Sequence, residues 1–279
     1  MTRRTRRAHA VVTGAGSGIG RAFAAELARR DGRVICADID LHTAEETAER
    51  IQSQGGAAIA VDCDVSGADD VRGLAEKARA WLGREPDLVV NNAGIGAGGR
   101  VVGESPLEDW HRTLGVNLWG VIHGCHTFLP AMREARAGGV INVASAAGFT
   151  AAPRMAAYNV SKAGVVSLSE TLAAELSGTG VGVTVLCPTF VRTNIFGGEL
   201  IDEAVSGLAR RVSDLVGFSP ERVARMTLDA HDRGRLYVVP QPDAQLFWHA
   251  KRFLPTPYAR VAGLLGRFVP AASAREKEK

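Results

Sequence analysis

The residues Thr13-Gly14-Ala15-Gly16-Ser17-Gly18-Ile19-Gly20 join a short apolar strand to a helical segment. The strand is predicted over His9–Thr13 and the helix over Arg21–Arg30. Glycines here let the backbone turn tightly and approach a pyrophosphate, and the start of the helix offers free N–H groups. The stretch therefore indicates a dinucleotide site. The candidate cofactor-binding residues within it are Gly14, Ser17, Gly18, Ile19 and Gly20. A tight turn without a ligand is the alternative.

Short β-branched runs alternate with helix-period stretches, which is the pattern of β-α-β units around a parallel sheet. Seven strands are predicted, at His9–Thr13, Arg33–Asp38, Ala57–Asp62, Leu88–Asn91, Val140–Ala144, Val181–Cys187 and Leu236–Val239. Helices are predicted at Arg21–Arg30, Thr43–Gln54, Ala68–Leu82, around Trp110–Arg133 and at Ala157–Leu176. The prediction is an α/β fold with one doubly wound domain over residues 1–239, whose ligands bind outside the carboxyl ends of the strands. Residues from about Thr189 to Gly217 are expected to form a substrate flap, and residues 240–279 a C-terminal extension with a flexible end.

Asp38 ends the second predicted strand and follows Gly14 at close to the spacing of about 20 residues at which an acid meets the adenosine ribose. A carboxylate at this position accepts hydrogen bonds from a free 2′-hydroxyl and repels a 2′-phosphate. Ser17 and Ile39 leave no Arg or Lys at the two places where a cation would receive that phosphate. The expected cofactor is therefore NAD rather than NADP. The alternative for Asp38 is a helix cap or a turn residue.

Tyr158 and Lys162 are four residues apart on a predicted helix and therefore share one face. An ammonium beside a phenol favours the phenolate, so the tyrosine pKa is predicted to fall from about 10 toward neutrality. Ser145 directly follows the strand Val140–Ala144, where its hydroxyl can position a substrate oxygen. Asn117 places an amide within a helical stretch. A solvated Tyr-Lys pair, and an Asn117 that only caps or bends a helix, are the alternatives.

From about Ala8 to Val239 the chain resembles the short-chain dehydrogenase/reductase family. The resemblance is carried by the glycine turn in its TGxxxGxG form, then in order by Asp64-Val65, Asn91-Asn92-Ala93-Gly94, Asn117, Ser145, Tyr158 and Lys162. It implies a Rossmann fold and a catalytic tetrad of Asn117, Ser145, Tyr158 and Lys162. Tyr158 would be the acid or base, Ser145 would orient the substrate oxygen, Lys162 would hold the nicotinamide ribose, and Asn117 would support a proton path through water.

The same resemblance implies cofactor contacts outside the glycine turn, and a homo-oligomer, either a tetramer or a dimer. Asp64 and Val65 would face the adenine, and Asn91, Ala93 and Gly94 would line the cofactor channel. Pro188 and Thr193 would lie at the nicotinamide end. One departure is Thr189, which stands where the family commonly has glycine and is expected to restrict that loop.

The candidate substrate-pocket residues are mostly apolar and come from loops beyond the strands; they are Ile95, Ala147, Phe149, Phe190, Ile195 and Phe196. They contain no cluster of Arg or Lys, so an apolar alcohol or ketone is expected rather than a highly anionic substrate. The segment from Leu246 to Phe268 interleaves aromatic and aliphatic residues with cations. It is expected either to pack on its own domain or a sister subunit, or to lie in a membrane surface.

Composition limits the class of protein. The 279 residues are 46% hydrophobic and 23% charged, with a formal charge of +3 that comes largely from the two ends, so no nucleic-acid partner is expected. The 4 cysteines are dispersed without a CxxC pair, and no His, Cys and carboxylate cluster suggests a metal. With no signal-like stretch and no run of about 20 apolar residues, a cytoplasmic protein is expected.

Three other functions share parts of this pattern. An NADPH-dependent reductase of carrier- or coenzyme-A-bound 3-oxoacyl chains has the same machinery, but Asp38 disfavours its cofactor. A non-catalytic protein that senses NAD and regulates a partner would not need Tyr158, Lys162 and Ser145 in register. Sugar-nucleotide epimerases share the Tyr-Lys pair, but their glycine turn has the TGxxGxxG form. In this chain the corresponding glycines are Gly14, Gly18 and Gly20.

Overall fold

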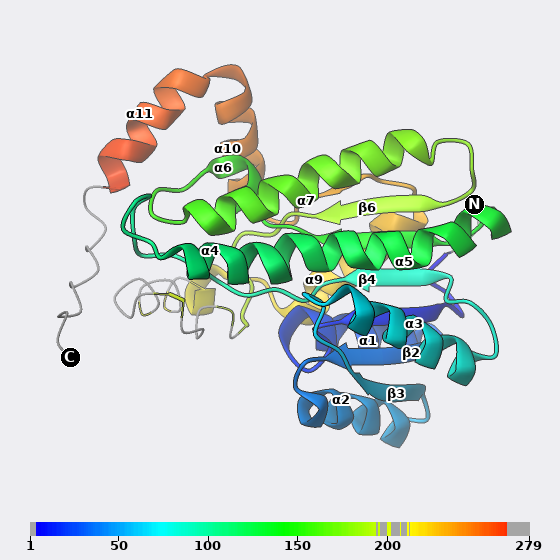
Figure 1. The fold of residues 1–279 in the computed structure, drawn as a ribbon. Helices are drawn as coiled ribbons and strands as arrows, with labels where there is room; N and C mark the ends of the chain where they lie inside the picture. Colours follow the sequence, from blue (N-terminus) through cyan, green and yellow to red (C-terminus); the bar gives the residue numbers. More distant parts are fainter. Residues whose placement is uncertain are drawn as a thin grey trace, which may run out of the picture.

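The protein contains one seven-stranded sheet in which every strand is parallel to its neighbours (Figure 1). The computed structural model describes residues 4–193, 195, 200–201, 207, 211 and 213–266. The strands are β1 His9–Thr13, β2 Arg33–Asp38, β3 Ala57–Asp62, β4 Leu88–Asn91, β5 Gly139–Val143, β6 Gly182–Leu186 and β7 Tyr237–Val238. Their order is β3-β2-β1-β4-β5-β6-β7, so the predicted doubly wound Rossmann sheet is confirmed.

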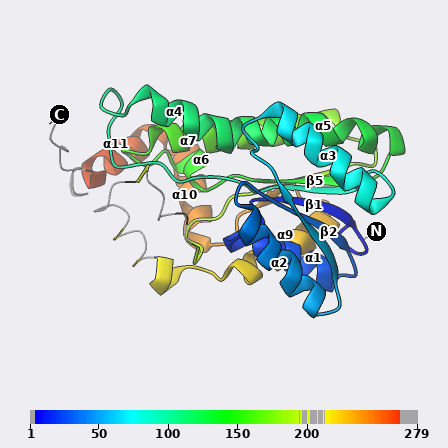
Figure 2. The ribbon, with the colours of Figure 1, turned by 60° about the horizontal axis from the view of Figure 1, so that its bottom comes forward.

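Helices cover both faces of the sheet (Figures 1 and 2). One layer contains α3 Ala68–Leu82, α4 Leu107–Leu114, the π-helical turn η1 Gly115–Trp119, α5 Gly120–Ala135 and α7 Ala156–Glu175. The opposite layer contains α1 Gly18–Arg29, α2 Leu41–Ser53 and α9 Pro220–Asp232. The short helix α6 Ala147–Thr150 precedes α7, and the chain continues in α10 Pro242–Phe253 and α11 Pro255–Gly266.

Alternating side chains of the strands build a separate core under each helical layer. Val11 of β1 pairs in register with Ile35 of β2, and both belong to the core beneath α3, α5 and α7. Val12 pairs with Cys36, and both belong to the core beneath α1, α2 and α9. Because each strand buries both faces, the strands are nearly continuous apolar runs, which is why their positions could be predicted from the sequence.

The first four strands have the predicted bounds, and the last three are slightly shifted or shorter. Helix α9 was not predicted, although its start carries ordinary signals. Ser219 caps it by accepting a hydrogen bond from the backbone N–H of Arg222, and Pro220 is its first residue. Only part of the predicted flap 189–217 and none of the chain end beyond residue 266 falls within the described residues.

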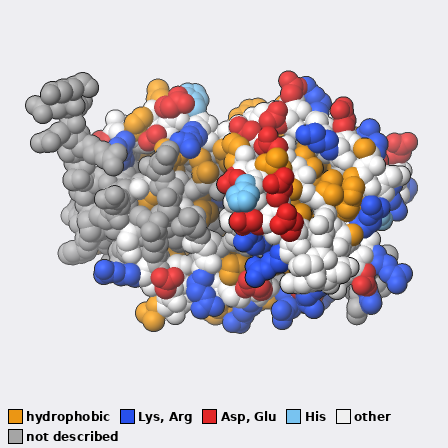
Figure 3. All heavy atoms as spheres, turned by 90° about the horizontal axis from the view of Figure 1, so that it is seen from below, with side chains coloured by type: hydrophobic (Ala, Val, Ile, Leu, Met, Phe, Trp, Pro, Cys, Tyr) orange, Lys and Arg blue, Asp and Glu red, His pale blue; other side chains and the backbone are white. Residues whose placement is uncertain are grey.

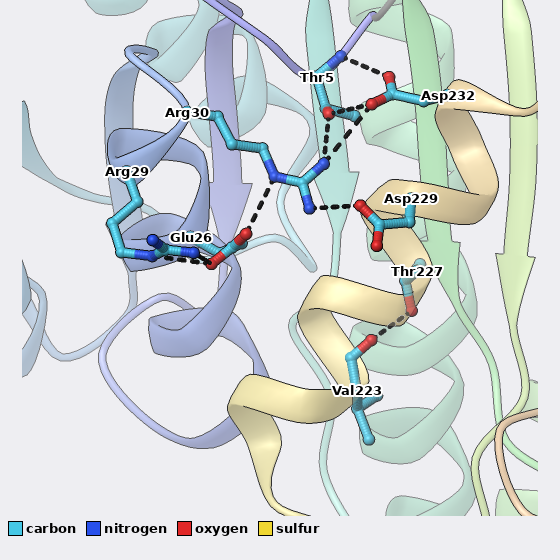
Figure 4. A network of polar contacts seen from close by, with 8 residues as sticks. All are labelled: Thr5, Glu26, Arg29, Arg30, Val223, Thr227, Asp229 and Asp232. Atoms are coloured by element: carbon cyan, nitrogen blue, oxygen red, sulfur yellow. Dashed lines mark hydrogen bonds and ion pairs between the residues drawn. The ribbon is translucent and has the colours of Figure 1, made fainter.

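An ion-pair network fixes the start of the chain to the carboxyl-terminal ends of α1 and α9 (Figure 4). The Arg30 guanidinium, just after α1, donates to Glu26 at 3.0 Å, to Asp229 of α9 at 2.7 Å and to the Thr5 hydroxyl at 2.8 Å. The Thr5 backbone N–H and hydroxyl donate to the carboxylate of Asp232. Residues 4 to 227 positions apart are thereby held together around an Arg30 side chain that is only 16% exposed.

The C-terminal extension is a pair of helices that lies at the α6 end of the molecule (Figure 1). Leu254 separates the two helices because Pro255 cannot continue α10 and instead begins α11. Among the described residues, none of the helices is long and apolar enough to cross a membrane. On the face seen from below, acidic and basic side chains are interspersed (Figure 3).

Candidate functional site

A cleft of about 1600 Å³ lies at the carboxyl ends of the strands, where the strand order reverses between β1 and β4. This is where a doubly wound sheet binds its ligand. Most of the residues predicted for cofactor or catalysis line it: Gly14, Ser17, Gly18, Ile19, Asp38, Asp64, Val65, Ala93, Gly94, Ser145, Tyr158, Lys162, Pro188 and Thr193. Of the predicted substrate residues, the cleft wall includes Ile95, Ala147, Phe190 and Ile195.

The glycine turn has the geometry of a phosphate cradle. Gly14 and Gly18 have φ of +65° and +51°, the left-handed region in which side chains are strained. Gly20 is buried on α1, and a Cβ there would lie 1.9 Å from the carbonyl oxygen of Gly14. Within the described chain the hydroxyl of Ser17 makes no capping bond at the start of α1, so the first N–H groups of the helix point to the cleft unshielded. These features fit the pyrophosphate of a dinucleotide.

Asp38 is tied to the glycine turn rather than to the following helix. One of its carboxylate oxygens accepts the backbone N–H of Gly16 at 2.8 Å, and the other accepts the N–H of Asp40 at 3.1 Å. The N-cap of α2 is Asp40, which accepts the N–H of Thr43, so Asp38 is not a helix cap. Its bond from the Asp40 N–H is the local contact of a turn residue. Asp38 is half-buried in the cleft wall and presents a carboxylate at the end of β2.

Tyr158, Ser145 and Lys162 come together where β5 ends and α7 begins. The Tyr158 hydroxyl is hydrogen-bonded to the Ser145 side chain. The Ser145 hydroxyl also accepts the N–H of Ala147 and lies 3.4 Å from the carbonyl oxygen of Pro188. Lys162 lies one turn beyond Tyr158, with its Nζ 5.8 Å from the centroid of the phenol ring. Tyr158 and Lys162 are both buried, so the Tyr-Lys pair is not a solvated one.

The predicted fall in the pKa of Tyr158 is wrong, because the pKa is raised in this structure. Burial raises the pKa of the Tyr158 phenol, and the hydrogen bond from Ser145 opposes that rise with a smaller effect. Desolvation also lowers the pKa of Lys162 to about 8. The sequence shows that the two side chains share a helix face, but it cannot show that both are buried away from water. Burial penalises the charged form of each group, which raises the pKa of a tyrosine and lowers that of a lysine.

Asn117 fixes the backbone beside the site. It lies in the π-helical turn η1, a geometry that recurs at functional sites. Its Oδ1 accepts the N–H of Ile95 at 2.8 Å, and its Nδ2 donates to the carbonyl oxygen of Ile95 at 2.9 Å. A Cβ on Gly94 would lie 3.1 Å from Asn117 Oδ1 and 3.4 Å from Lys162 Nζ, so the two polar groups flank Gly94. Asn117 is fully buried and does not itself line the cleft.

Besides Gly20 and Asn117, two more predicted residues do not line the cleft. Asn91 is buried behind the cleft, where its amide donates to Asn142 of β5 at 2.8 Å, so it braces the sheet instead of lining the channel. Phe149 does not line the cleft either, because its ring stacks on Trp248 of α10 with the centroids 5.5 Å apart. Phe196 lies outside the described residues.

Thr189 takes an ordinary backbone conformation in the loop after β6. It is not among the described residues with positive φ, and its N–H donates to Gln241 Oε1 at 3.2 Å. Its hydroxyl lies 3.4 Å from Asp243 Oδ1 at the start of α10. Gln241 Nε2 donates to the carbonyl oxygen of Phe190 at 2.9 Å. The residue that departs from the family pattern therefore joins the loop to the C-terminal extension.

Sequence reasoning missed one wall of the cleft. Two arginines, Arg112 and Arg154, line it and are engaged in contacts. Apolar residues of the C-terminal helix pair line the cleft as well, including Leu246 of α10, Val261 of α11, and Leu254 between the two helices. The aromatic and aliphatic composition of this segment was the available signal, but it did not indicate which surface the side chains face. Within the described part of the chain, no group of three or more His, Cys, Asp or Glu is placed to hold a metal.

Comparisons with known proteins agree with this geometry. The family model described as short chain dehydrogenase matches residues 8–203. The probable oxidoreductase EphD of Mycobacterium tuberculosis is 37% identical over 254 residues, which is 88% of this chain but only 43% of that protein. The chain thus spans less than half the length of this relative. The 1-deoxy-11-beta-hydroxypentalenate dehydrogenase of Streptomyces exfoliatus is 34% identical over 85% of this chain and 84% of its own.

A solved structure resembles nearly the whole chain. It is a crystal structure of a short-chain dehydrogenase/reductase from Burkholderia phymatum in complex with NAD, with 35% identity and a TM-score of 0.85. The match covers 91% of this chain and 95% of that one. The fold, the cleft and these comparisons lead to one conclusion, that the chain belongs to the short-chain dehydrogenase/reductase family of oxidoreductases.

Proposed function

We propose that the protein transfers a hydride between NAD(H) and an apolar secondary alcohol or ketone, with Tyr158 as the general acid and base. The observation that carries this proposal is the hydrogen bond between Tyr158 and Ser145 in the wall of the cleft that also contains the glycine turn. When bound, the nicotinamide supplies hydride exchange, and the positive charge of its oxidised ring favours the phenolate.

Each polar residue then has a distinct role. The raised pKa of Tyr158 keeps the phenol protonated at neutral pH, which is the form that protonates a carbonyl oxygen during reduction. Ser145 donates a second hydrogen bond to that oxygen and holds it beside the phenol. Lys162 holds the nicotinamide ribose. Asn117 fixes the Ile95 backbone and supports a proton path through water toward Lys162.

The preference for NAD rests on Asp38. Its carboxylate faces the cleft at the end of β2, where it would accept bonds from the adenosine ribose hydroxyls and repel a 2′-phosphate. The nearest cation on α1, Arg21, is committed to Glu46 at 3.1 Å and to the carbonyl oxygen of Gly16. The NAD complex of the relative from Burkholderia phymatum supports a nicotinamide cofactor in general.

The apolar substrate class rests on the balance of charge at the substrate end of the cleft. The lining of the cleft includes Glu108 and Asp243 as well as Arg112 and Arg154, and most of the other residues near the C-terminal helix pair are apolar. A neutral substrate loses little hydration in such a site, whereas a highly anionic one would find no excess of positive charge among these four side chains.

The test is a spectrophotometric screen of secondary alcohols and ketones with NAD and NADP in parallel. We expect activity with NAD, a loss of at least about 100-fold in kcat for Tyr158→Phe, and no loss for the control Tyr237→Phe, whose hydroxyl contacts Glu170 outside the cleft. The charge-removing variant Asp38→Asn should raise the ratio of NADP to NAD use about tenfold, since about 1.4 kcal/mol of repulsion is lost.

Different outcomes would favour the alternatives. Exclusive use of NADPH on carrier- or coenzyme-A-bound 3-oxoacyl chains would favour the acyl reductase. Tight NAD binding without turnover, unchanged in Tyr158→Phe, would favour a regulatory sensor.

Homo-oligomerisation, as a dimer or tetramer, is a further part of this proposal. Trp119 in η1 and Val160 in α7 are 53% and 50% exposed, on the long helices expected to form the subunit contact. Light scattering should give a mass of two or four chains, and a monomeric mass for Trp119→Lys would place the contact on this face.

Peripheral contact with an anionic membrane surface is favoured by one specific observation. Phe253 and Leu264 project from the helix pair with 75% and 55% exposure, and the pair also contains Lys251, Arg252 and Arg260. Co-sedimentation of the full chain with anionic vesicles, compared with Phe253→Ser, tests this contact. Equal recovery in the supernatant with and without vesicles would exclude it.

A further inference from the structure

The cleft continues beyond the catalytic residues into a wall made by the C-terminal helix pair. Leu246 and Phe247 of α10, Leu254 between the helices, and Tyr258 and Val261 of α11 line the same continuous cleft as Ser145 and Tyr158. Met155 and Ile201 line the same cleft. A substrate oxygen placed at Tyr158 therefore leaves an open apolar path along α10 and α11.

Contacts with the catalytic domain fix the position of this wall. Gln241, just before α10, is buried. Its side chain accepts the N–H of Thr189 and donates to the carbonyl oxygen of Phe190. Trp248 lies between Phe149 of α6 and Tyr237 of β7, with ring centroids 5.5 and 4.9 Å away. Helix α10 is therefore attached to the loop after β6, to α6 and to the edge strand. A wall fixed at three places is pre-organised for binding.

Much of the apolar surface of the wall is exposed to solvent. Leu246, Leu254 and Val261 are 67%, 59% and 55% exposed, although all three line the cleft. A ligand lying along them would remove this surface from water, and the free energy gained grows with each apolar group that it contributes.

We propose that the α10–α11 wall binds the body of an extended apolar alcohol or ketone, such as a long alkyl chain or fused hydrocarbon rings, while its oxygen lies at Ser145 and Tyr158. This inference deepens the proposed function and rests on it for the position of the oxygen. The C-terminal helices thereby set substrate length, and Leu254 and Val261 are specificity-determining residues.

The test uses 2-alkanols from 2-butanol to 2-decanol with NAD and the full-length protein. Each added methylene that reaches the wall should raise kcat/KM by roughly threefold to fourfold, the effect of burying one methylene. Leu254→Ser should raise the KM for 2-decanol by about tenfold and leave the KM for 2-butanol unchanged. The matched control is Leu264→Ser, because Leu264 is 55% exposed on the same helix pair but does not line the cleft.

Calorimetric titration with 2-decanone gives a second readout that needs no turnover. We expect binding with a negative heat-capacity change, weakened by Leu254→Ser and unchanged by Leu264→Ser. A flat dependence of kcat/KM on chain length, or equal damage from the two serine variants, overturns the inference while leaving the dehydrogenase function intact. Absence of turnover with every alcohol, combined with binding of 2-decanone that only Leu254→Ser weakens, overturns the proposed function and supports the wall.

Discussion

The Lys162 ammonium donates a hydrogen bond to the carbonyl oxygen of Val143, 3.0 Å away at the end of β5. This bond connects α7 to the strand that leads into Ser145, so a single side chain holds together the two elements that bring Tyr158 and Ser145 into contact. Because Lys162 is buried, the bond is made away from water, where its loss is costly.

Lys162→Met should lower kcat/KM by about 100-fold or more, because it removes both a fixed positive charge and the bond to Val143. Steady-state kinetics with NAD measure this effect. The control is Lys77→Met on the exposed face of α3, which should retain the parent activity. Parent-like activity of Lys162→Met would show that the Tyr158–Ser145 pair works without the ammonium.

Gly20→Ala should abolish the fold of the glycine turn and cofactor binding together, because the new Cβ would lie 1.9 Å from the Gly14 carbonyl oxygen. Thermal melting with and without NAD measures both effects. The matched control is Gly73→Ala in α3, where no neighbouring atom lies within 4 Å of the new Cβ. That substitution should stabilise the protein by about 0.5–1 kcal/mol through helix propensity. A Gly20→Ala protein with parent stability and NAD affinity would contradict the close packing of α1 on the turn.

Stability should fall as pH decreases from 7 to 5, and His231 should account for about 2 kcal/mol of this loss. Burial lowers the pKa of His231 from 6.5 to about 4 in the folded protein. The unfolded chain therefore binds a proton below about pH 6.5 that the folded chain refuses until about pH 4. The stabilisation is complete above pH 6.5 and is lost as pH falls through this window.

Urea unfolding of the parent and of His231→Gln at pH 7 and pH 5 tests this contribution. The variant should lose about 2 kcal/mol less than the parent over that range. The control is His42→Gln, because the His42 side chain is 81% exposed. This variant should lose as much unfolding free energy between pH 7 and pH 5 as the parent. An identical pH dependence of His231→Gln and the parent would show that folding does not lower the pKa of His231.

Arg30→Met should destabilise the protein by about 3 kcal/mol, because it leaves the carboxylates of Glu26, Asp229 and Asp232 without their shared cation. Equilibrium unfolding at neutral pH measures the change. Arg72→Met is the control, since Arg72 and its partner Asp69 are 64% and 83% exposed, and the expected change is within about 0.5 kcal/mol. Equal effects of the two variants would mean that the network in Figure 4 adds no more than a surface ion pair.

The sequence by itself determined the sheet and the identity of the nucleotide end of the cleft. Strands buried on both faces are continuous apolar runs, and the glycines from Gly14 to Gly20 have a conformational reason that local spacing reveals. The same holds for Tyr158 and Lys162, because helical geometry alone places residues four apart on one face.

Only the tertiary structure decided the properties that depend on contacts between distant segments. The pKa direction of Tyr158 depends on burial, which no local pattern contains. Phe149 and Trp248 lie far apart in the sequence and stack on each other, which removes Phe149 from the cleft. The helix pair α10–α11 became a wall of the site because Gln241 and Thr189 join it to the loop after β6. An amphipathic segment specifies that it must bury an apolar side, whereas the surface that it covers is set by the rest of the fold.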